Sequence, residues 1–461
     1  MVGLTADRRV IRSGGGRRGE GALNGSPSPR ARSLTLLAVA AVIGVAVGRF
    51  LAFDAPPVAS VAPARTPEAM IAALEEAVAG NPDDLRSLQA LGLAYLRRAA
   101  QIGDPSFFSL AEEALDRADR LAPTDSRTLL ARGALALARH EFAPALRLAT
   151  QAHQADPFDA EALGVMVDAQ VELGRYDDAA RRLQQMLDLR PGLAALSRVS
   201  YLRELRGDLP GAMEAMHQAR TAGAGSPFDV AVVEALLGDL SFSQGDVDAA
   251  EGAYRRALEL SPELVTAWVG RARLEAARGD AAGAIEELQD VTARFPQQDA
   301  LILLGELLSS EGREDEAEAV YELVRVIARL QEEAGQVVDL EMALFEADHG
   351  RPEQAVNLAR RAYAVRPTIY AADALAWSLA QAGEAQAARS YLAEAKRLGT
   401  ADALFHFHAA VIYEQVGDTN GGRRELGQAF ETNPWFTFFL RNRATELADR
   451  LGVPVPSEWG R

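Results

Sequence analysis

Residues 236–262 read LLGDLSFSQGDVDAAEGAYRRALELSP, and this stretch decides the fold. Gly238 is followed seven positions later by Gly245, then by an alanine at Ala250, and the stretch closes on Pro262. Glycine readily adopts positive φ and can open a tight turn, whereas proline is harmless where a helix ends or begins. A small residue at position 238 lets two helices approach closely. The stretch therefore predicts two antiparallel helices joined at Gly245.

The same spacing recurs along most of the chain. A marker glycine is followed five positions later by a small residue, and a mostly small residue stands seven positions before it. Successive markers lie 33, 34 or 38 residues apart. One hairpin cannot cover its own apolar face, so neighbouring hairpins are expected to stack into a continuous core. The markers are His140, Gly174, Gly207, Gly245, Gly279, Gly312, Gly350, Gly383 and Gly417.

These columns resemble those of the tetratricopeptide repeat (TPR) family. One closely matching unit carries Leu236, Leu237, Gly238, Ala250, Tyr254, Ala257 and Pro262. The resemblance covers roughly residues 82–434. It implies an all-α fold, a right-handed α-solenoid of about ten TPR helical hairpins. It also implies that the first helices of successive hairpins line a concave groove that receives peptide or helix ligands.

Two departures from the regular spacing and two flanking segments complete this organisation. One insertion falls at residues 222–227, a candidate hinge, and the other is expected to lengthen the helix over Glu314 to Glu333. Residues 67–81 are predicted to form a leading helix ahead of the array at 82–434. Residues 435–461 are predicted to form the capping helix and tail that repeat arrays require.

The amino-terminal region predicts a membrane anchor. Residues 1–33 form a basic arm expected to be disordered. Residues 34–53 are predicted to be a transmembrane helix, and residues 54–66 a Pro/Ala-rich linker. The arginines of the arm predict a cytoplasmic amino terminus, with the repeats on the periplasmic or extracellular side of the plasma (inner) membrane. Two alternatives are a signal peptide cleaved near residues 58–60 and a buried helix.

Charge and composition exclude several classes of function. The net charge is −17, but residues 1–53 carry +6 and the remainder −23. A body this acidic repels polyphosphate, so no nucleic-acid partner is expected. Cysteine is absent, Lys396 is the one lysine, and the six histidines are scattered. His406 and His408 are interpreted as packed or half-exposed side chains. With no phosphate-binding loop and no hydrolase or metalloprotease motif, the sequence predicts no enzyme, no catalytic residues, no cofactor and no metal.

We call the mostly small residues seven positions before the markers the small-residue column. The resemblance places groove residues three positions before, one after and four after each residue of this column. Aromatic side chains between acids suit a protein segment that carries apolar anchors and some positive charge. The alternative is that these side chains only fill the inner wall of the solenoid. Few basic residues and no asparagine occupy these columns, which disfavours capture of an acidic tail. The candidate partner-binding residues are Tyr201, Glu204, Asp239, Phe242, Arg273, Glu306, Asp373 and Trp377.

A second candidate surface is the aromatic cluster at residues 435–439. It is expected to lie against the last repeat, with a partner-binding or membrane-touching patch as the alternative. The leading hypothesis for function is a non-enzymatic scaffold or adaptor that mediates protein–protein interaction on the outer face of the plasma membrane. The alternatives are an envelope assembly factor or holdase, of the translocon-associated or cytochrome-maturation type, and a self-associating repeat. The partner and the oligomeric state stay open.

Overall fold

The computed structural model describes residues 35–36, 53–54, 67–223 and 227–460, all of which belong to one compact unit, Ser33–Arg461. Two short strands precede the helices, β1 (Thr35–Leu36) and β2 (Phe53–Asp54), and a 3-10 turn at Ser457–Gly460 follows them. The helices are α1 (Pro67–Gly80), α2 (Leu85–Ile102), α3 (Ser106–Leu121), α4 (Ser126–Ala138), α5 (Phe142–Ala155), α6 (Ala160–Glu172), α7 (Tyr176–Leu189), α8 (Leu193–Glu204), α9 (Leu209–Ala222), α10 (Pro227–Ser243), α11 (Val247–Leu260), α12 (Val265–Ala277), α13 (Ala281–Arg294), α14 (Gln298–Ser310), α15 (Glu314–Glu333), α16 (Asp339–Asp348), α17 (Pro352–Val365), α18 (Ile369–Gln381), α19 (Ala385–Ala395), α20 (Ala403–Gln415), α21 (Thr419–Thr432) and α22 (Arg441–Leu451).

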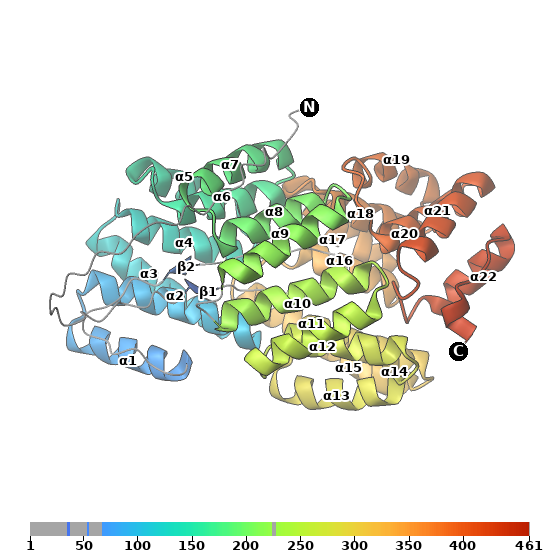
Figure 1. The fold of residues 1–461 in the computed structure, drawn as a ribbon, viewed down its shortest axis with the longest axis horizontal. Helices are drawn as coiled ribbons and strands as arrows, with labels where there is room; N and C mark the ends of the chain where they lie inside the picture. Colours follow the sequence, from blue (N-terminus) through green and yellow to red (C-terminus); the bar gives the residue numbers. More distant parts are fainter. Residues whose placement is uncertain (1–34, 37–52, 55–66, 224–226, 461) are drawn as a thin grey trace, which may run out of the picture. The chain divides into compact units, whose positions relative to one another are not determined.

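From α2 to α21 the helices form consecutive hairpins (Figure 1), which confirms the predicted α-solenoid. Every marker glycine from Gly174 to Gly417 has positive φ, and His140 takes the same conformation with φ 61°. The alanines five positions after the markers are buried at equivalent places in the hairpins. They are Ala145, Ala179, Ala212, Ala250, Ala284, Ala317, Ala355 and Ala388.

The small-residue column has a steric cause. The Tyr254 ring of α11 packs so closely on α10 and α12 that a Cβ on Gly238 or Gly270 would collide with it. Tyr321 does the same to Gly305, further along the array. Because protein interiors are close-packed, such contacts set the distance between helices. At Gly238 and Gly305 the column is therefore small because an aromatic ring of the neighbouring helix fills the space.

The structure explains one of the two 38-residue intervals between marker glycines. Helix α15 spans Glu314–Glu333 without interruption, so the predicted lengthening of this helix is confirmed. Its buried residues follow a helical repeat from Ala317 to Ala328. The other insertion includes residues 224–226, which lie outside the described residues.

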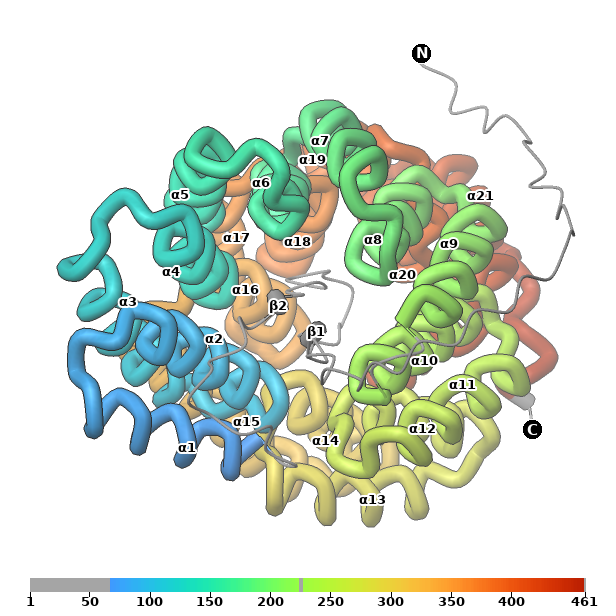
Figure 2. The backbone as a smooth tube through the Cα atoms, turned by 60° about the vertical axis from the view of Figure 1, so that its left-hand side comes forward, coloured from blue at the N-terminus to red at the C-terminus, as the bar shows by residue number. Residues whose placement is uncertain are grey.

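One turn of the solenoid lies against the next (Figure 2). The His140 Nδ1 atom lies 2.7 Å from the carbonyl oxygen of Val337, 197 positions away. The backbone N–H of Ile369 donates to the Tyr176 hydroxyl at 3.0 Å, across 193 positions. The Gln297 side chain donates to the Gln101 carbonyl at 3.1 Å, across 196 positions. Hairpins one full turn apart are therefore bonded to one another as well as to their neighbours in sequence.

The predicted single-pass plasma-membrane location is wrong, and the amino-terminal transmembrane helix from which it was inferred is not supported. In the described part of the chain, no helix is both long enough and apolar enough to cross a membrane. The described ends of the predicted helix are strands: β1 pairs antiparallel with β2, Thr35 opposite Asp54 and Leu36 opposite Phe53. The rest of the predicted helix, residue 34 and residues 37–52, lies outside the described residues.

Candidate functional site

Charged and aromatic side chains follow one another along the first helices of the later hairpins. These even-numbered helices lie on the inner side of the solenoid, and the odd-numbered helices lie outside (Figure 2). We call this row the inner strip. It comprises Asp239 on α10, Arg273 on α12, Asp299 and Glu306 on α14, Asp348 and His349 at the end of α16, Asp373 and Trp377 on α18, and Asp402 and His408 at the start and middle of α20.

The first part of the inner strip centres on Arg273. Asp239 accepts a hydrogen bond of 2.8 Å from the Tyr254 hydroxyl of α11, which fixes the position of the carboxylate. Burial raises the pKa of Asp299 to about 6, and the charge of Arg273 opposes this shift. Burial also raises the pKa of Glu306, and Arg273 again acts in the opposite direction. A single guanidinium therefore serves two carboxylates of the neighbouring helix α14.

Glu306 lies where acids outnumber bases. Its pKa is raised to about 8, mainly by burial and also by the charge of Asp348, while the charge of Arg273 acts against both. The His349 Nε2 atom lies 3.8 Å from the Glu306 carboxylate. The His349 ring is 4.0 Å from the Tyr321 ring, and its burial lowers the pKa of this imidazole to about 3. The neighbouring histidine is therefore neutral and supplies no charge to Glu306.

Trp377 is the centre of the last part of the strip. Its indole N–H donates to Asp348 at 2.8 Å, and the His408 ring stacks on it at 4.0 Å with an interplanar angle of 15°. His408 Nδ1 lies 2.8 Å from Asp373 Oδ2. Burial raises the pKa of Asp402 to about 6, and the nearby Asp373 adds to the shift. Three carboxylates, a histidine and a tryptophan thus form one connected polar cluster.

The structure places all eight predicted partner-binding residues on first helices. It brings together Asp239, Arg273, Glu306, Asp373 and Trp377 in the inner strip. Tyr201 and Glu204 lie on α8, ahead of the strip. Four of the eight are buried, namely Tyr201, Phe242, Asp373 and Trp377, while Glu204, Asp239, Arg273 and Glu306 are half-buried. Their role in binding stays a prediction.

Sequence reasoning missed Asp299, Asp348, His349, Asp402 and His408. Asp348 and His349 stand at the end of α16, past the columns that the family pattern assigns to the groove. Asp402 caps α20 by accepting from the N–H of Leu404 and Phe405, and a cap is itself a sequence signal. The sequence predicts a packed or half-exposed side chain for His408, and in the structure this side chain is 1% exposed. A search of helix termini as well as helix faces would have found four of the five, since Asp299 lies in the first turn of α14.

The charged groups of the inner strip determine which ligands would suit it. In the ranges that the structure describes, no group of three or more metal-ligating side chains is placed to hold an ion. The excess of carboxylates in a partly buried row instead favours a cationic or hydrogen-bond-donating ligand. A ligand of this kind would relieve the repulsion that contributes to the raised pKa of Glu306.

We expect Glu306→Gln to stabilise the chain more at pH 8.5 than at pH 6. A carboxyl whose folded pKa is near 8 holds its proton in the folded state, so its contribution to stability falls as pH rises towards 8. Glutamine has no proton to lose, and the gain should grow by about 2 kcal/mol between the two pH values. Urea unfolding of both proteins measures it. The exposed Glu311→Gln, at the end of the same helix, should show no such pH dependence.

Comparison with known proteins supports the repeat assignment. Two family models described as tetratricopeptide repeat match residues 136–199 and, in two overlapping copies, 236–299 and 269–331. No curated protein matches the chain. The regular hairpins and the inner strip define a helical-repeat protein with a candidate binding surface on its first helices. The matched residues, 136–199 and 236–331, are tetratricopeptide repeats.

Three solved structures give weak overall superpositions. A thermophilic TPR protein of Thermus thermophilus is 21% identical over 40% of this chain and 97% of its own, with a TM-score of 0.35. A tetratricopeptide repeat protein from Parabacteroides merdae is 18% identical over 53% and 98%, with a TM-score of 0.36. PilW, a widely conserved type IV pilus biogenesis factor, is 20% identical over 44% and 92%, also at 0.36. Because these TM-scores are low, the family assignment rests on the family models alone.

Proposed function

We propose that the chain is a non-enzymatic scaffold that binds segments of other proteins along the inner strip. TPR repeats generally bind protein partners, and stacked repeats create the long inner surfaces that such binding uses. The observation that carries the proposal is the row of coupled charges from Asp239 to His408. Carboxylates exceed cations there, and the buried rings of Trp377 and Phe242 lie on the same first helices.

The chemistry of the strip favours a partner segment with positive charge and apolar anchors. A cation placed between Glu306 and Asp348 would offset the repulsion between these two carboxylates. Because the pKa of Glu306 is raised to about 8, such a cation would bind better as pH rises and Glu306 becomes charged. Binding through this row should also weaken with salt, although less than at a fully exposed surface.

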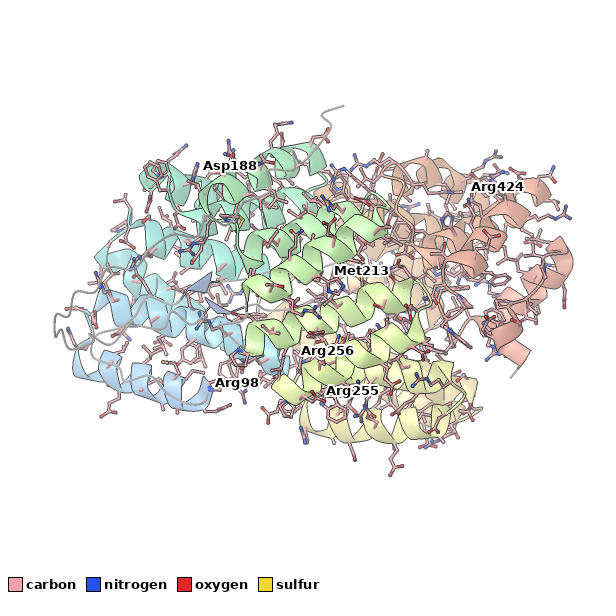
Figure 3. The ribbon with its side chains drawn as sticks, in the orientation of Figure 1. Arg98, Asp188, Met213, Arg255, Arg256 and Arg424 are labelled. Atoms are coloured by element: carbon pink, nitrogen blue, oxygen red, sulfur yellow. The ribbon has the colours of Figure 1, made fainter. Side chains whose placement is uncertain are left out.

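Site-specific photo-crosslinking in cells tests the proposal. Benzoylphenylalanine is placed at positions 242 and 306 on the inner side, and at positions 188 and 255 as matched outer controls. Asp188 and Arg255 are exposed on the second helices α7 and α11 (Figure 3). We expect partner crosslinks from 242 and 306 and several-fold fewer from 188 and 255. Equal yields from all four positions, with cooperative melting retained, would contradict binding through the inner strip.

A further inference from the structure

The segment that follows α21 does not continue the solenoid in the regular way. A regular next helix would stack on α20 and α21 alone. Here the Phe436 ring lies 5.3 Å from Phe407 of α20, and the Phe439 ring lies 4.9 Å from His349 at the end of α16. The Arg443 guanidinium then lies 4.9 Å over the Trp377 ring of α18. Residues 433–443, the C-terminal strap, therefore turn back across the first helices of three hairpins.

The strap occupies the inner strip through two side chains of different chemistry. Phe439 joins the aromatic group formed by His349, Tyr321 and Phe345. Arg443, four residues later, donates to the Gln381 side chain at 2.8 Å, and its charge lies near Asp348. An aromatic ring and a cation spaced by four residues match the aromatic and acidic character of the strip. The strap thus has the chemistry of a ligand of this surface.

The fit between strap and strip is incomplete. Several buried polar atoms of the strip have no hydrogen-bond partner within the described part of the chain. Asp373 Oδ1 and His408 Nε2 are two of them, on side chains that are 4% and 1% exposed. His349 Nδ1 and the Tyr321 hydroxyl are two more, in the aromatic group that Phe439 joins. A ligand that supplied partners to these atoms would bind this surface better than the strap does.

We propose that the C-terminal strap is an exchangeable intramolecular ligand, and that a partner segment bound over α16, α18 and α20 displaces it by presenting an aromatic residue and an arginine four residues later. This inference rests on the proposed function, because it names the kind of segment that the inner strip accepts. The anchor residues Ala444, Leu447, Ala448 and Leu451 hold the rest of α22 on the last hairpin, so only residues 433–443 need to move.

The test uses the full chain and a labelled synthetic peptide of residues 433–452. In the wild type the tethered strap competes at an effective concentration of about 1 mM, so the peptide should bind weakly. The variant F439A/R443A loses its own strap contacts, and we expect it to bind the peptide roughly tenfold more tightly in fluorescence anisotropy. A peptide with the same two substitutions should bind neither protein. The variant N442A/E446A changes two exposed residues of the same segment and should behave as wild type.

The outcomes are decisive in both directions. Equal peptide affinity for wild type and F439A/R443A, with cooperative melting in both, would overturn the proposal. Should the double variant not melt cooperatively, the single variant Arg443→Gln decides by the same comparison, because it removes the cation and keeps Phe439. Failure here would leave the crosslinking test at positions 242 and 306 unaffected. Loss of those crosslinks, with tight peptide binding retained, would instead remove the wider proposal that the strip binds other proteins.

Discussion

Replacing Arg366 by methionine is expected to lower the free energy of unfolding by about 3–5 kcal/mol. Arg366 is 3% exposed, and its guanidinium lies 3.4 Å from the Glu172 carboxylate and 3.0 Å from that of Glu341. Methionine keeps much of the apolar volume but leaves both carboxylates without their cation. Burial already raises the pKa of Glu172 to about 8 with the arginine in place. Urea unfolding at pH 7.5 measures the loss.

Arg360→Met is the matched control, because Arg360 is exposed on α17 and lies 3.8 Å from the Glu384 carboxylate. Its effect should stay within about 0.5 kcal/mol. Glu172 and Arg366 lie 194 positions apart, so Arg366→Met should also speed amide hydrogen exchange in α6 and α18, on both sides of the junction between turns. Equal losses in the two variants would mean that the charge bridge between turns contributes nothing particular.

The fold could be predicted from the sequence because its signals are local. Gly245 needs positive φ for its own turn, and Ala250 is buried by the helix that this turn sends back. Each hairpin repeats this pattern, so a unit whose own residues depart from it can still be assigned from the regular spacing of its neighbours. The bonds between turns have no such signal. His140 contacts Val337 because the small rotations between successive hairpins add up to a full turn of the solenoid. No repeated residue position indicates the size of this total rotation.

The inner strip could be predicted in part. The family columns placed Asp239, Arg273, Glu306, Asp373 and Trp377 on one side because helical periodicity fixes which residues share a face. They did not indicate that Trp377 is fully buried. Arg443, which lies over its ring, comes from a segment beyond the array, where the family columns do not apply. The aromatic cluster at 435–439 was expected to lie against the last repeat. It does so through Phe436 on Phe407 and Phe430, but it also reaches α16.

The carboxyl groups with raised pKa values lower the stability of the fold, and they are also the groups that we propose to bind a partner. Glu306, Asp299 and Asp402 all hold protons more tightly in the folded chain than in the unfolded one, with burial as the first cause in each. Such groups lower stability as pH rises. A row of buried acids is costly to the fold, and sites of this kind often serve function at the expense of stability. This links the pH prediction for Glu306 to the proposed role of the strip.

Trp377→Ala is expected to cost about 3–5 kcal/mol of stability, which makes it a poor probe of binding by itself. Trp377 is 0% exposed, so alanine would leave a large cavity between His408, Phe407 and Arg443. It would also take away the N–H that Asp348 accepts, and a buried carboxylate without its donor adds to the loss. Thermal and urea unfolding should both report the change, together with faster amide hydrogen exchange in α18 and α20.

The matched control is Trp268→Ala, because Trp268 is half-buried on α12, donates to the Pro262 carbonyl at 2.8 Å and carries Arg271 over its ring at 4.1 Å. We expect it to cost about 1 kcal/mol. Comparable losses at the two tryptophans would argue that the C-terminal strap does not bury Trp377 in solution. If Trp377→Ala instead loses most of its excess cost in the F439A/R443A background, the two sites are coupled. That non-additivity is the result we expect, because part of the burial of Trp377 is supplied by the strap itself.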